Sequence, residues 1–193
     1  MTGDRAVRIL AVCSHNRTRS VMMAALLESL LTERLDEGAV QLRSSGFGPA
    51  GLPPIDDAVD AMERRGLDIS AHRSSPTTVS LVDGADLILT AERDHVVKVA
   101  ALSTEAFRRA MTLPEFLAAA AGTGHDHEAD IRSWVQSLTE QRTAVAYLRE
   151  PVPEVADPTG SLHRAFESAV VTIEQQCREA ASHLVTQLAA RSS

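Results

Sequence analysis

Cys13 and Arg19 lie at the two ends of a short polar segment, CSHNRTR, that has residue types suited to attack on a phosphate ester. An apolar run over residues 6–12 precedes it, and apolar residues at helical spacing begin at Thr18. A strand that ends in a tight loop and opens a helix directs backbone N–H groups and the positive end of the helix dipole at one point. We expect Cys13 to be held there as a thiolate and Arg19 to grip an oxyanion with two N–H groups.

The chemistry that follows is an in-line displacement at phosphorus. Arg19 and the amides of residues 14–19 would hold the equatorial oxygens, where charge must be stabilised. Ser20 could donate a hydrogen bond to the sulfur when it leaves, and the departing alkoxide or phenolate requires an acid. Taken alone, Cys13 could be a structural cysteine and Arg19 a surface charge, but the strand–loop–helix context favours a functional site.

The rest of the chain alternates between strand and helix patterns. This alternation predicts an α/β fold, doubly wound, with a four-stranded parallel sheet, helices on both faces and a phosphate-binding loop after the first strand. The expected strands are residues 6–12, 40–44, 86–90 and 110–113. The expected helices are residues 18–35, 55–65, 92–102, 114–121, 131–148 and 163–190, with irregular segments at 122–130 and 149–160.

Composition excludes several classes of function. The chain has 193 residues, 44% of them hydrophobic, and a net charge of −7 without a basic run, so neither a nucleic acid nor a membrane is an expected partner. Two cysteines provide no disulfide framework and no CxxC metal site. The N-terminal residues do not have the pattern of a signal peptide. We expect one cytoplasmic domain over residues 1–193 that needs no cofactor and no metal.

Four segments carry a resemblance to a known family. VCSHNRTRSVMMAALLESLL (12–31), RSSGFGPAGLPPIDDAVDAMERRGLDISAHRS (43–74), DLILTAERDHVVKV (86–99) and EVADPTG (154–160) resemble, in that order, the low-molecular-weight protein tyrosine phosphatases. The resemblance covers most of residues 6–100 and 154–190. Residues 103–150 match weakly and are expected to be an atypical, mostly helical insertion.

The resemblance implies roles for individual residues. Cys13 would be the nucleophile, Arg19 the phosphate clamp, and Asp157 the acid of the first step and the base of the second. Substrate would be bound by the remaining loop residues, namely Ser14, His15, Asn16, Arg17, Thr18 and Ser20. A polar network that supports the loop would contain Asn16, Ser20, Ser44 and His72.

The chain departs from the family pattern near the implied site. Thr18 stands where the family often has a second cysteine, so the disulfide that protects the nucleophile from peroxide would be absent. Thr159 and Gly160 follow the Asp-Pro pair where tyrosines are common, which puts a preference for phosphotyrosine in doubt. Phe47 is a candidate pocket wall or a packing residue. His15 and Arg17 would favour a polar or anionic substrate.

Two further groups of residues have a structural interpretation. His125, Asp126, His127 and Asp130 fit no zinc spacing, so we expect a solvated loop that caps the next helix. Cys177 lies in the apolar stripe of the last expected helix, and we expect it in the core.

Three functions are compatible with these residues. The first is a phosphomonoesterase that acts through a phosphocysteine on a phosphorylated protein or a small phosphorylated metabolite. The second is arsenate reduction with an external low-molecular-weight thiol, because residues 80–100 contain no cysteine to relay a disulfide. The third is a non-catalytic module that binds a phosphorylated ligand. The sequence does not specify an oligomeric state.

Overall fold

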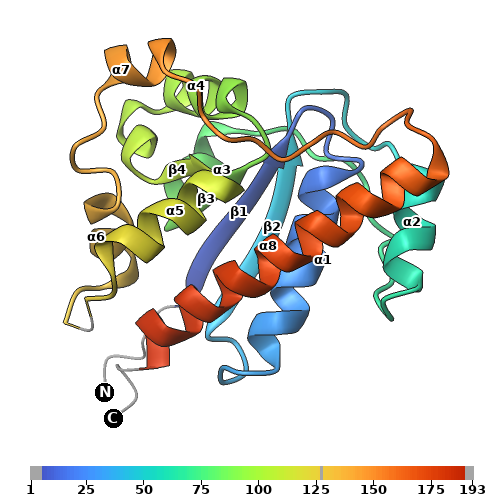
Figure 1. The fold of residues 1–193 in the computed structure, drawn as a ribbon, viewed down its shortest axis with the longest axis horizontal. Helices are drawn as coiled ribbons and strands as arrows, with labels where there is room; N and C mark the ends of the chain where they lie inside the picture. The colour runs from blue at the N-terminus through green and yellow to red at the C-terminus, as the bar shows by residue number, and fades with distance from the viewer. Residues whose placement is uncertain (1–5, 127, 190–193) are drawn as a thin grey trace.

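A four-stranded parallel sheet forms the centre of the molecule (Figure 1). The structure is a computed structural model that describes residues 6–126 and 128–189. The strands β1 (Val7–Cys13), β2 (Val40–Gly46), β3 (Leu87–Thr90) and β4 (Ala110–Thr112) lie in the order β2-β1-β3-β4. The expected doubly wound sheet is thereby confirmed. The strand order reverses at β1, so the loop after Cys13 occupies the position where such sheets bind ligands.

Helices cover both faces of the sheet, as the sequence predicts. One apolar cluster holds side chains of α1 (Arg19–Thr32), α2 (Asp56–Glu63), α5 (Leu113–Thr123), α6 (Ile131–Ser137) and α8 (His163–Ala189). The other holds side chains of α3 (Val79–Gly84), α4 (Arg93–Leu102), the 3₁₀ helix η1 (Thr104–Arg108) and α7 (Ala144–Arg149). Ile9 and Ala11 of β1 face the first cluster, whereas Leu10 and Val12 face the second.

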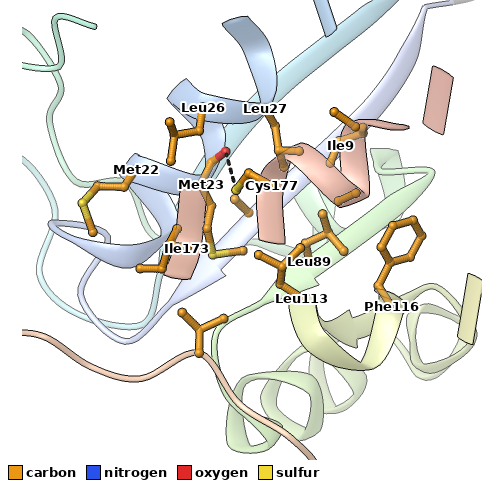
Figure 2. Close-up of a cluster of buried hydrophobic side chains, with 14 of the residues drawn as sticks. Ile9, Met22, Met23, Leu26, Leu27, Leu89, Leu113, Phe116, Ile173 and Cys177 are labelled. Atoms are coloured by element: carbon orange, nitrogen blue, oxygen red, sulfur yellow. Dashed lines mark hydrogen bonds between the residues drawn. The ribbon is translucent and has the colours of Figure 1, made fainter. Parts of the chain in front are cut away.

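Cys177 lies in the first of these clusters, between α8 and α1. Figure 2 shows its thiol directed at the backbone of α1, where Sγ lies 4.0 Å from the carbonyl oxygen of Met23. The side chain is fully buried, and burial raises the pKa of the Cys177 thiol. The expectation that this cysteine belongs to the core is confirmed.

The long helix α8 buries one stripe and exposes the rest. Its buried residues include Val170, Ile173, Cys177, Ala181 and Leu184, as expected, and Leu188 is partly buried against the same cluster. Within the described residues, none of the helices is both long enough and apolar enough to cross a membrane.

The expectation of one helix over residues 131–148 is wrong. The structure has α6 and α7 there, separated by a turn over residues 138–143. Thr139 turns its hydroxyl to the carbonyl oxygen of Arg108, and Arg142 reaches the carbonyl oxygen of Ala110. Residues 138–143 contain no proline or glycine that would end a helix, so we attribute the break to these tertiary contacts. The short helix α3 was also not expected. Residues 1–5, 127 and 190, for which expectations were stated, lie outside the described residues.

Candidate active site

The loop between β1 and α1 is shaped by a residue in the left-handed backbone region. Cys13 ends β1 and Arg19 begins α1. Between them Asn16 has a φ of 54°, a conformation that asparagine adopts more readily than most residues. The turn brings the Asn16 N–H back to the Cys13 sulfur, at 3.3 Å.

A second donor reaches the Cys13 sulfur from the first turn of α1. The Ser20 Oγ lies 3.0 Å from Sγ and accepts a hydrogen bond from Asn16 Nδ2, also at 3.0 Å. Because Asn16 supplies the hydrogen in that second bond, the Ser20 hydroxyl hydrogen is available for the sulfur. Two donors at the sulfur are the partners that a thiolate requires.

Asn16 is fixed from three sides by residues of other segments. Its Nδ2 donates to Ser44 Oγ at 2.9 Å, and its Oδ1 accepts from the Ser75 N–H at 2.8 Å. Its carbonyl oxygen lies 2.9 Å from His72 Nε2, which must be the donor because a carbonyl only accepts. The structure thus brings Asn16, Ser20, Ser44 and His72 together around the loop.

Gly46, at the end of β2, leaves room for this loop. A Cβ at this position would lie 2.7 Å from Asn16 N and 2.9 Å from the Cys13 carbonyl oxygen, and neither backbone atom can move without distorting the loop. Gly46 was not among the site residues predicted from the sequence, although it lies in the segment over residues 43–74 that carries the family resemblance.

The Arg19 side chain is buried and bonded to three acceptors. One terminal nitrogen, Nη1, donates to Glu92 Oε1 at 2.5 Å and to the Val155 carbonyl oxygen at 3.2 Å. The other, Nη2, donates to Asp157 Oδ2 at 2.8 Å. A guanidinium has five N–H groups, so Nε–H and one Nη2–H have no acceptor among the described residues. These two groups are neighbours and can bind two oxygens of a phosphate together.

Asp157 lies on the segment before α8, which crosses the carboxyl ends of the strands (Figure 1). Val155 N–H donates to the Ala91 carbonyl oxygen at 2.8 Å, which attaches this segment beside β3. The Asp157 side chain is 47% exposed, and its Oδ1 accepts from the Thr159 N–H at 3.0 Å. The carboxylate therefore lies next to Arg19 and is open to solvent.

Glu92 and His95 also belong to this region, although neither was among the site residues predicted from the sequence. Both come from the beginning of α4, directly after β3. Glu92 binds Arg19, and His95 Nε2 lies 3.0 Å from Ser14 Oγ. Their position after a buried strand, at the edge where ligands bind, was the available signal.

The remaining loop residues differ in exposure and in their contacts. His15 is exposed and packs against Gly48, while Thr18 is buried. Arg17 Nε donates to the Pro53 carbonyl oxygen at 2.6 Å. Phe47 packs with the second apolar cluster and stacks on His95, with 6.1 Å between ring centroids.

His125 of the 122–130 segment does not join this site. His125 packs between Trp134 and His183. Asp130 caps α6 by accepting from the Ser133 N–H at 3.0 Å, which confirms the expected cap. His127 lies outside the described residues.

Comparison with known proteins identifies relatives among phosphatases. The chain is 44% identical over 82 residues to the probable low molecular weight protein-tyrosine-phosphatase EpsP of Ralstonia solanacearum, a match that covers 42% of this chain and 52% of that protein. It is 33% identical over 116 residues to the protein-arginine-phosphatase of Bacillus subtilis, covering 59% and 75%. The match to EpsP thus spans about half of that relative's length.

The fold has relatives among solved structures. The YwlE arginine phosphatase from Geobacillus stearothermophilus superimposes with a TM-score of 0.69 at 25% identity, covering 93% of this chain and 94% of that one. A sequence model described as low molecular weight phosphotyrosine protein phosphatase matches residues 8–131. The chain therefore belongs to the low molecular weight phosphotyrosine protein phosphatase family.

Proposed function

We propose that this protein is a phosphatase that acts through a phosphocysteine intermediate on Cys13. The observation that carries the proposal is the meeting of three groups at the carboxyl end of β1. These are a sulfur with two hydrogen-bond donors, a buried guanidinium with two adjacent N–H groups to spare, and a solvent-accessible carboxylate 2.8 Å from that guanidinium. Membership of the low molecular weight phosphotyrosine protein phosphatase family supports the same activity.

In the first step, the Cys13 thiolate attacks phosphorus as the bond between phosphorus and the leaving oxygen breaks. Arg19 and the loop amides hold the other phosphate oxygens, where negative charge must be stabilised. Asp157, in its acid form, gives its proton to the leaving oxygen. The exposure of Asp157 suits this role, because the leaving group must face away from the loop.

In the second step, the Asp157 carboxylate takes a proton from water as the water oxygen bonds to phosphorus. The sulfur–phosphorus bond breaks, and inorganic phosphate and the thiolate are released. The Ser20 hydroxyl stabilises the departing sulfur across the 3.0 Å contact. Asn16, Ser44 and His72 keep the loop in place through both steps.

The substrates that we propose are phosphorylated side chains of proteins, because the relatives are a probable protein-tyrosine-phosphatase and a protein-arginine-phosphatase. We also propose a cytoplasmic location, since Cys13 and Cys177 are both free thiols and Cys13 must stay reduced. Arg17 and exposed His15 in the loop favour substrates with polar or acidic surroundings. A panel of phosphotyrosine peptides, phosphoarginine peptides and small phosphorylated metabolites would rank these substrates.

Hydrolysis of p-nitrophenyl phosphate tests the proposal. We expect Cys13→Ser to abolish turnover, while Cys177→Ala, at a core cysteine outside the site, keeps it. In Asp157→Ala the first step, measured as the initial burst of leaving group, should slow by about 10²–10⁴-fold for esters with poor leaving groups and much less for p-nitrophenyl phosphate. Glu179→Ala, at an exposed carboxylate on α8, is the matched control.

Other results would contradict the proposal. Full activity in both Cys13→Ser and Asp157→Ala would show that the site is elsewhere. Arsenate consumption that depends on an added small thiol, with negligible ester hydrolysis, would indicate an arsenate reductase. Phosphopeptide binding without turnover would indicate a binding module.

A further inference from the structure

His95, in the first turn of α4, contacts the phosphate loop, and its hydrogen bonds determine which ring nitrogen carries the proton. Its side chain is 1% exposed. The ring nitrogen Nδ1 accepts a hydrogen bond from the Glu92 N–H at 3.1 Å, so it carries no proton. The ring hydrogen of a neutral imidazole is then on Nε2. This nitrogen lies 3.0 Å from Ser14 Oγ and is the donor in that contact.

The surroundings keep the ring neutral. Burial is the largest effect and lowers the pKa of His95 from its ordinary value of 6.5. The cations Arg19 and Lys98 act in the same direction, and the carboxylates Glu92 and Asp94 oppose it. A proton on Nδ1 would also break the hydrogen bond from the Glu92 backbone, which forms part of the cap of α4.

This arrangement determines what the Ser14 side chain can do. Its oxygen accepts from His95, so the hydroxyl hydrogen points elsewhere, and no acceptor for it occurs among the described residues. Ser14 directly follows Cys13, and its carbonyl oxygen accepts from the Phe47 N–H at 2.8 Å. The hydroxyl is therefore held at the start of the loop with one donor unused.

We propose that His95 is a positioning residue of the phosphate site, which fixes Ser14 so that its hydroxyl donates a hydrogen bond to an oxygen of the bound phosphate ester. The inference rests on the proposed function and adds a side-chain donor to the loop amides and Arg19. It also gives α4 a part in substrate binding.

The alternative is that His95 only caps α4 and supports Phe47. The two roles use different ring atoms, because Nδ1 serves the cap and Nε2 serves Ser14. His95→Asn places an amide oxygen near the position of Nδ1, so it can keep the cap but cannot reach Ser14. His95→Gln places an amide N–H near the position of Nε2, so it can keep the Ser14 contact.

Affinity for inorganic phosphate, measured by calorimetry on the full chain, tests the inference without requiring turnover. We expect Ser14→Ala and His95→Asn each to weaken binding about tenfold, the effect of one hydrogen bond to a charged group. The double variant should be no weaker than either single variant, because both remove the same contact. His95→Gln and Ser14→Thr should bind phosphate within about threefold of the unchanged protein.

Two results would overturn the inference. One is unchanged phosphate affinity in Ser14→Ala, and the other is additive losses in the double variant. Circular dichroism shows whether His95→Asn folds. If it does not fold, the phosphate affinity of Ser14→Ala tests the inference. Failure of the proposed function would look different, since the unchanged protein would bind phosphate without hydrolysing any ester. Steady-state kinetics with p-nitrophenyl phosphate give a second readout. Loss of the Ser14 contact should raise KM more than it lowers kcat.

Discussion

Arg19 has five N–H donors, and its surroundings divide them into two groups. Three are bonded to Glu92, Val155 and Asp157, which fix the plane of the guanidinium. The other two, on the adjacent nitrogens Nε and Nη2, form the phosphate grip that we propose. Only the planar guanidinium of arginine can bind these three acceptors and still present two parallel N–H groups. A lysine ammonium has no fixed pair of parallel donors.

Replacing Arg19 by lysine should therefore be severe although the charge is kept. We expect Arg19→Lys to lower kcat/KM for p-nitrophenyl phosphate by about 10²–10³-fold, the effect of removing an oxyanion donor. Arg34→Lys is the matched control, because Arg34 is exposed and its side chain donates a hydrogen bond to Ser182 on the surface. Equal activity of the two variants would contradict the role of Arg19.

Gly46 provides a test of the loop's shape. A Cβ there would meet backbone atoms at 2.7 and 2.9 Å, so Gly46→Ala must displace either the loop or β2. We expect at least a tenfold loss of phosphate affinity together with lower thermal stability. Gly122→Ala, in α5 with open space around it, should leave both unchanged or raise stability slightly. Normal phosphate binding by Gly46→Ala would contradict this account.

How far the site could be predicted depended on where each residue lies in the sequence. Cys13, Arg19 and Asn16 share one short segment, and residue type with spacing was enough to place them together. Glu92 and His95 lie more than 70 residues away from their partners Arg19 and Ser14. Their contacts depend on the pairing of β3 beside β1, which the residue pattern of the loop does not contain.

Among the elements, α8 and α2 are joined by ion pairs rather than only by apolar contact. Arg65 of the turn after α2 reaches Glu174 at 2.7 Å and Glu167 at 2.8 Å. Hydrogen bonds from Arg178 and Arg65 hold the pKa of Glu174 below its ordinary value of 4.5. A carboxylate with a lowered pKa in the folded state stabilises the fold above about pH 4.5, and this contribution is lost as the pH falls through the folded-state pKa.

Glu174→Gln should remove this contribution. We expect the free energy of unfolding to fall by ~1 kcal/mol at pH 7 and to depend less on pH in the acid range than in the unchanged protein. Urea denaturation at several pH values measures both effects. Glu179→Gln, also on α8 but exposed, is the control and should change neither. An identical pH dependence in Glu174→Gln and the unchanged protein would refute the assignment.

The elements themselves were predicted best where burial follows a regular pattern. The four strands and the helices beside the loop have apolar residues at the expected spacing, and the structure places them within a few residues of the predicted bounds. The turn between α6 and α7 could not be predicted, because Thr139 and Arg142 break the helix through contacts with η1 and β4. The description of residues 103–150 as an insertion within one domain stays a prediction.

For the whole molecule, the fold creates two different environments for its two cysteines. Both thiols are buried, but Cys13, which is 3% exposed, has two hydrogen-bond donors at its sulfur, whereas Cys177 lies in the apolar core, where burial raises the pKa of its thiol. Thr18 provides no second thiol in the loop. The chain should therefore have a single reactive cysteine in its folded state.

Alkylation with iodoacetamide tests this difference. Peptide mass spectrometry of the folded protein should find the adduct on Cys13 and none on Cys177, and inorganic phosphate should slow the reaction. In Cys13→Ser the folded protein should stay unmodified, while denaturation should expose Cys177. Modification of Cys177 before Cys13 would contradict the proposed environments.

Trapping the covalent intermediate is the most direct test of the central claim. Asp157→Ala should still form the phosphoenzyme from p-nitrophenyl phosphate, because this leaving group needs little help from an acid, but should hydrolyse it slowly. Rapid acid quench followed by mass spectrometry should find one phosphoryl group on the peptide that contains Cys13 and none in Cys13→Ala/Asp157→Ala, where the side chain has no nucleophile. Turnover without that label, or a phosphoryl group on another residue, would contradict the account.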